Sequence, residues 1–214
     1  MAYYIFRERE FLKKFRVFIA ILFCMACLLS VATAAGVSDI IGEAQSYGIR
    51  EAALSSDQFL APWHSYEEKA QQLNGDANQA YCYTPFSVVA FDAWGKSNNH
   101  QLVFLRDGEK IWRDYAGFFT FSIQLYFTDP VLPTDFAVWI EQKKQKIYSY
   151  QVNISREIKP VIIADADKTT KPLYLLSGNC YFMDDIIRQD SPLVLVAAVK
   201  DKQYRFYFNM TVIR

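Results

Sequence analysis

The segment TFSIQLYF at residues 120–127 decides the fold class of this chain. Its apolar residues Phe121, Ile123, Leu125 and Phe127 occupy every second position, and Thr, Ser, Gln and Tyr occupy the positions between them. Successive side chains of a β-strand point to opposite faces of a sheet. The alternation therefore predicts a strand with one buried face.

Similar short runs continue on both sides of this segment, separated by Pro, Gly, Asn, Asp and Lys-rich turns. They predict about nine or ten short strands. On the N-terminal side they are SVVAFDAW (87–94), QLVFL (101–105) and EKIW (109–112). On the C-terminal side they are DFAVWIEQ (135–142), KIYSYQVNIS (146–155), PVII (160–163), PLYLL (172–176), PLVLVAAV (192–199) and YRFYFNMTVI (204–213). In the last run Tyr204, Phe206, Phe208, Met210 and Val212 are expected to share one face.

Many short strands without intervening amphipathic helices favour a mainly β fold. The pattern predicts an antiparallel β-sandwich with immunoglobulin-like or jelly-roll connectivity. A closed β-barrel is the alternative, because barrel strands also alternate between inward and outward residues.

Three regions are expected along the chain. Residues 1–34 form a signal peptide or an uncleaved N-terminal anchor, residues 35–80 form a helical or linker segment, and residues 81–214 form the β-sandwich domain. Within the middle region a helix is expected from Ser38, which suits an N-cap position, and a second helical piece is expected at residues 65–73.

The apolar run VFIAILFCMACLLSVATAAG at residues 17–36 follows a segment in which five basic residues outnumber two acidic ones. A basic segment followed by an apolar one is typical of an export signal. The small residues Ala32, Thr33 and Ala34 match the pattern that signal peptidases cleave, whereas the full run is long enough to span a bilayer. Both alternatives predict an extracytoplasmic location, either periplasmic, cell-surface or secreted, with membrane contact only through residues 17–36 if the leader stays uncleaved.

Two of the four cysteines, Cys24 and Cys27, lie inside this apolar leader and serve as small apolar residues. The other two, Cys82 and Cys180, would lie in an oxidising compartment. We therefore expect a disulfide between Cys82 and Cys180, with two separate buried thiols as the alternative.

Charge and acidic residues limit the function classes. Beyond Gly36 the acidic residues outnumber the basic ones by three and no basic cluster occurs, which argues against a nucleic-acid partner. No cofactor motif is present, but Asp165 and Asp167 have a spacing that suits a calcium-binding loop, with a solvated turn as the alternative.

The sequence carries no catalytic motif, so an enzyme is not the favoured class. We expect an exported cell-envelope protein that acts as a non-catalytic binding or assembly module, with another envelope or surface protein as its partner. The edge of a sandwich offers unpaired backbone groups for such a partner. The alternatives are a glycan- or calcium-dependent adhesion domain and an extracytoplasmic hydrolase without a linear motif.

Overall fold

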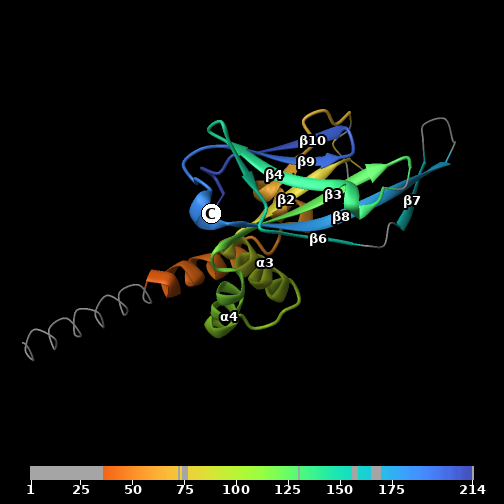
Figure 1. Cartoon of the computed structure of the whole chain (residues 1–214). Coiled ribbons are helices and arrows are strands. Elements are labelled where there is room, and N and C mark those ends of the chain that lie inside the picture. Colours follow the sequence, from red (N-terminus) through yellow and green to blue (C-terminus); the bar gives the residue numbers. More distant parts are fainter. Residues whose placement is uncertain are drawn as a thin grey trace, which may run out of the picture.

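The computed structural model describes residues 36–71, 73, 77–129, 131–155, 159–164 and 170–213. Figure 1 shows two groups of strands with the helices gathered near one end of them. The expected leader at residues 1–34 lies outside the described residues. Within the residues that the structure describes, no helix is both long and apolar enough to cross a membrane.

The larger sheet has six strands in the order β1-β2-β3-β8-β6, and β7 pairs with the beginning of the long strand β8. All of its pairings are antiparallel. The strands are β1 (His64–Tyr66), β2 (Gln79–Tyr83), β3 (Phe118–Phe127), β6 (Gln151–Ile154), β7 (Lys159–Ala164) and β8 (Thr170–Met183). We call it the large sheet.

The smaller sheet has four antiparallel strands in the order β10-β9-β4-β5. They are β4 (Phe136–Gln142), β5 (Gln145–Tyr148), β9 (Leu193–Val199) and β10 (Lys202–Phe208). A single backbone bridge between Glu67 and Phe206 links this small sheet to the end of β1. The described strands form two sheets rather than one closed sheet, so the predicted sandwich-like fold is confirmed and the barrel alternative is not adopted.

The inner faces of the two sheets enclose the core. In β3, Phe121, Ile123 and Leu125 are buried as the alternation predicts, and Phe127 packs against the same core. Phe121 contacts Phe208 of β10 with ring centroids 5.3 Å apart, so this face of the large sheet is turned toward the small sheet. Each side chain of this size stabilises the fold by roughly 1.5 to 3 kcal/mol when it leaves water.

The helices lie near the ends of β2 and β3 (Figure 1). A helix over residues 36–50 comes first and packs against α3 and α4, as its close approach to both at Gly48 and Gly108 shows. It is followed by the helices α2 (Ser56–Leu60), α3 (Pro85–Asn98) and α4 (Leu105–Tyr115) and by the 3-10 turns η1 (Ala61–Trp63), η2 (Pro133–Asp135) and η3 (Asp184–Ile186).

The strands expected at residues 87–94, 101–105 and 109–112 were wrong, because α3 and α4 occupy most of these residues. The start of α3 explains the first error. Thr84 caps the helix and Pro85 occupies its first turn. Behind this cap the buried residues Phe86, Val89 and Ala90 recur at helical spacing.

Two smaller expectations also differ from the structure. Residues 65–73 were expected to be helical, but β1 occupies part of them and α2 ends before them. In the last strand, Tyr204, Phe206, Phe208 and Met210 are buried as expected, whereas Val212 is exposed. The alternation fails there because β10 ends at Phe208 and a turn follows it.

Candidate functional site

A pocket of about 600 Å³ lies where the helices meet the sandwich. This volume is within the range of about 300 to 1,000 Å³ that is typical of ligand pockets. The residues that line it come from six segments of the chain and are mostly apolar. They are Ile40, Glu43, Thr84, Pro85, Phe86, Trp112, Phe119, Asp184, Gln189 and Ile213.

The beginning of α3 forms one wall of this pocket. The backbone N–H of Thr84 donates to Oγ of Ser87 at 2.8 Å, and the backbone N–H of Ser87 donates to Oγ1 of Thr84 at 3.1 Å. This reciprocal capping satisfies two backbone donors that the first turn would otherwise leave without partners. It holds Pro85 and Phe86 in fixed positions along the pocket.

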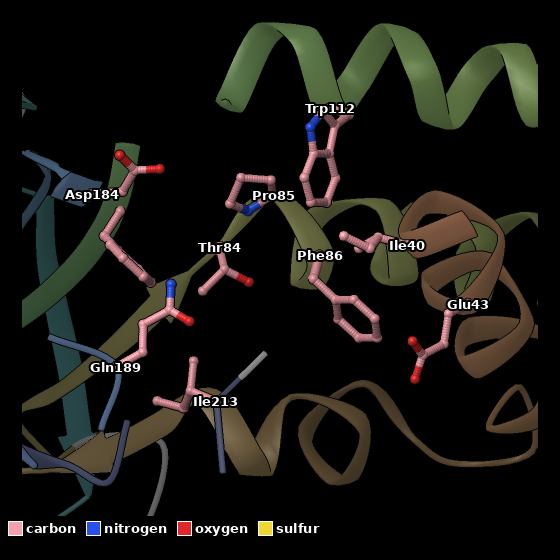
Figure 2. Close-up of a pocket in the computed structure, with 10 residues that line it drawn as sticks. Ile40, Glu43, Thr84, Pro85, Phe86, Trp112, Asp184, Gln189 and Ile213 are labelled. Carbon is pink, nitrogen blue, oxygen red and sulfur yellow. The ribbon is translucent and has the colours of Figure 1, made fainter. Parts of the chain in front are cut away.

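The helix over residues 36–50 forms the opposite wall with Ile40 and Glu43. Its position against α4 is maintained by Gln45, whose side-chain amide donates to the carbonyl oxygen of Phe104 at 2.9 Å. Trp112 of α4 reaches the pocket between these walls, as Figure 2 shows.

The two charged residues of the pocket are both acidic. Figure 2 places Asp184, from η3, and Glu43, from the helix over residues 36–50, on opposite sides of the pocket. The lining residues that the structure describes include no Lys, Arg, His, Cys or Ser. The apolar walls with two carboxylates suit binding of an apolar group with a positively charged neighbour.

A second candidate surface is the outer face of the large sheet. We call its part over β1, β2, β3, β6 and the second half of β8 the uncharged face; the β7 end of the sheet, which contains Lys159 and Lys171, is not included. The uncharged face comprises the side chains of β1, β2, β3, β6 and residues 177–183 of β8 that alternate with the buried inner ones and so point away from the small sheet. None of them is Asp, Glu, Lys or Arg. They are His64, Tyr66, Gln79, Tyr81, Tyr83, Phe118, Thr120, Ser122, Gln124, Tyr126, Gln151, Asn153, Ser177, Asn179, Tyr181 and Met183.

Hydrogen bonds hold several of these side chains in place. Nε2 of His64 lies 2.9 Å from Oε1 of Gln79, and the Gln79 amide donates to Oε1 of Gln124 at 2.9 Å. Burial lowers the pKa of His64, since the charged ring is poorly solvated there. The neutral ring therefore predominates at pH 7, and its Nε2–H donates to Gln79 in that form.

The predicted calcium ligands Asp165 and Asp167 lie outside the described residues. The calcium prediction is therefore not tested. In the part of the chain that the structure does describe, no group of three His, Cys, Asp or Glu side chains is placed to hold a metal ion.

The predicted disulfide between Cys82 and Cys180 is not formed, and both residues are free, buried thiols. The strand register gives the reason. Cys82 of β2 and Cys180 of β8 each pair with Phe121 of β3, from its two sides. Two strand spacings separate their backbones by about 9.6 Å, whereas disulfides join Cα atoms about 4.4 to 6.8 Å apart.

We expect both thiols to be unreactive in the folded protein. Burial raises the pKa of Cys82 and raises that of Cys180 to about 12, so almost no thiolate forms at neutral pH. Alkylation with iodoacetamide followed by peptide mass spectrometry should modify neither residue in the native protein and both after denaturation without reductant. Recovery of a peptide pair linked through Cys82 and Cys180 would contradict the structure.

Sequence reasoning missed the pocket entirely, because its walls come from residues 40 to 213 and no local motif marks them. Part of the uncharged face could be predicted from the sequence. The polar positions of TFSIQLYF identify one strand of it, but the neighbours of that strand follow only from the pairing of β3 with β2 and β8.

No family model matches the chain, and no curated protein or solved structure matches it significantly.

Proposed function

We propose that this protein is an exported, non-catalytic binding module of the cell envelope, and that it holds a segment of a partner protein in the pocket. The observation that carries the proposal is the pocket itself, with its apolar walls and its two carboxylates. The N-terminal sequence supports the envelope location, because a basic segment precedes an apolar run that ends in small residues.

The chemistry of the pocket favours one kind of partner segment. Phe86, Trp112 and Ile213 offer an apolar surface on which a large side chain can be desolvated. Glu43 and Asp184 lie on opposite sides of that surface (Figure 2), where they can pair with Lys or Arg residues of the partner. The expected segment therefore carries an apolar residue with basic residues near it.

The position of the pocket agrees with a partner close to the leader. Ile40 and Glu43 lie within seven residues of Gly36 on the same helix, which is about 10 Å along the helix axis. If the leader is an anchor, this distance keeps the pocket near the membrane surface. A second envelope protein is the natural partner at that location.

The edge strand β5 is less suitable for a partner than the pocket. β5, at the edge of the small sheet, spans only Gln145–Tyr148 and follows a turn that contains Lys143 and Lys144. Lys146 lies over the Trp139 ring at 3.6 Å from its centroid. Short edge strands rich in lysine are a common protection against pairing with other chains. Strand addition at β5 is therefore disfavoured.

A photo-crosslinking experiment tests this function. A benzoylphenylalanine residue placed at Ile40, which is 41% exposed, should give one discrete adduct in irradiated cells. The same residue at Lys202 serves as the control, because Lys202 and Phe127 line another pocket at the far end of β3, about 27 Å from Phe119. The crosslinked partner peptide should contain Lys or Arg beside an apolar residue.

Charge reversal provides the matched comparison. Asp184→Lys should remove the adduct, since it replaces attraction by repulsion, whereas Asp201→Lys at the far pocket should leave it intact. The proposed function is wrong if Ile40 gives no adduct, if Lys202 gives the same adduct, or if the adduct survives Asp184→Lys.

A further inference from the structure

We propose that the uncharged face of the large sheet binds an uncharged glycan chain. This site is separate from the pocket, because the two share none of the residues named for them. The inference therefore does not depend on the proposed docking of a partner protein.

The first argument is the width of the face and its lack of charge. One row of directly paired residues crosses five strands, from His64 through Tyr81, Ser122 and Asn179 to Asn153. Four strand spacings give this row a length of about 19 Å, which suits an extended ligand of several rings. About 25–35% of the residues of a well-behaved protein surface are charged. Five uncharged positions in a row are therefore common, but sixteen neighbouring positions without a charge are not.

The second argument is the side-chain chemistry of the face. The rings of His64, Tyr81 and Tyr83 form a row, with centroids 4.6 Å and 6.2 Å apart, and the planes of Tyr81 and Tyr83 lie within 13° of parallel. Tyrosine rings offer an apolar surface for the C–H face of a sugar ring, as well as a hydroxyl for hydrogen bonding. The amides of Asn179 and Asn153 are exposed at the other end of the row, where they can both donate to and accept from sugar hydroxyls.

The third argument is preorganisation. The chain of hydrogen bonds from His64 through Gln79 to Gln124 fixes polar side chains before any ligand arrives. Groups that are already ordered lose less entropy when a ligand binds. Beside them, Thr120 is 5% exposed and its Oγ1 has no hydrogen-bond partner in the described structure. Thr120 pairs with Tyr83 and Tyr181 on the two neighbouring strands, so this hydroxyl lies on the same face of the sheet as both tyrosines.

Other occupants fit this face less well. Nucleic acids and acidic glycans need basic side chains, and the uncharged face has none. The carboxylate of Asp57 acts electrostatically on both His64 and Tyr81 and would repel anions. The cores of protein interfaces are depleted in serine, whereas this face carries Ser122 and Ser177 near its centre. An uncharged polyol requires no ion pair and uses the amides and hydroxyls that are present.

Isothermal titration calorimetry on the purified full-length chain tests the proposal. The probes are cellopentaose and penta-N-acetylchitopentaose, whose equatorial hydroxyls leave apolar ring faces, with trigalacturonate as the acidic control. At least one neutral probe should bind saturably, and trigalacturonate should not bind. Tyr181→Ala should weaken binding about tenfold, since it removes a ring from the face.

Two variants serve as controls. Tyr207→Ala removes a 59% exposed ring from the other sheet and should leave the affinity within about twofold of wild type. Asp184→Lys alters the pocket and should also leave glycan binding unchanged, which separates this proposal from the proposed function. Circular dichroism establishes that each variant is folded.

Three results would overturn the proposal. The first is that neither neutral probe binds at about 10 mM, a concentration that detects very weak complexes. The second is that Tyr181→Ala binds as well as the wild-type chain or that Asp184→Lys abolishes binding. The third is a dimer in sedimentation equilibrium that Asn179→Lys dissociates, because the face would then be a self-association surface.

Discussion

Replacement of Phe121 by alanine should lower the free energy of unfolding by about 4 kcal/mol. Phe121 is completely buried at the centre of the core. Its ring lies 5.5 Å from that of Phe182 at 90° and 5.3 Å from that of Phe208 at 68°. The substitution loses these edge-to-face contacts and leaves a cavity that two paired sheets cannot easily close.

Urea unfolding followed by circular dichroism measures this loss. The control is Tyr207→Ala, which removes a 59% exposed ring from the small sheet and should change the unfolding free energy by no more than about 0.5 kcal/mol. Equal losses for the two variants would mean that the two sheets do not pack face to face through Phe121.

Gly48→Ala should destabilise the protein by about 3 kcal/mol, although alanine is the better helix former. Gly48 lies where the helix over residues 36–50 crosses α3. A Cβ atom at this position would overlap the carbonyl oxygen of Ala90 and lie 2.8 Å from the backbone nitrogen of Trp94. Both are backbone atoms of a helix, so neither can move aside unless the two helices separate.

Gly42→Ala is the matched control, because it changes the same residue type in the same helix at a position with no atom within 4 Å of the added Cβ. That variant should raise the unfolding free energy by up to about 1 kcal/mol, through helix propensity alone. If Gly48→Ala is also stabilising, the two helices are farther apart than the structure places them.

The separation of the helices also affects the pocket. The helix over residues 36–50 contributes Ile40 and Glu43 to one wall, and Phe86 lies in the first turn of α3. A shift at Gly48 would therefore change the distance between these two walls. We expect Gly48→Ala to weaken the photo-crosslink from Ile40, whereas Gly42→Ala should preserve it.

The strands could be predicted from the sequence where one face of the strand is buried and the other is exposed to solvent. In β3 and β4 the alternation of Phe121, Ile123, Val138 and Ile140 with polar residues identified both strands and their buried faces. This succeeds because the pleat of a strand imposes a period of two on any sequence that buries one side.

The helices α3 and α4 were not predictable in the same way. The run SVVAFDAW contains residues that favour strands, and a strand reading is reasonable for it in isolation. Thr84 and Ser87 form the cap that starts the helix, but serine is not the usual partner in this motif. Gly108 resembles a turn residue, but it lies inside α4, where side-chain atoms of Ile41 and Gln45 lie 2.6 Å and 2.8 Å from the position that a Cβ atom would take.

The sequence by itself determined that strands with one buried face would form, because alternation is a local property that each strand carries alone. The tertiary structure decided which strands are neighbours. That choice placed Phe121 between Cys82 and Cys180 and prevented their disulfide. It also brought Ile40, Asp184 and Ile213 to one pocket and assembled an uncharged face from five strands. These features depend on contacts between residues far apart in the chain, which no local pattern encodes.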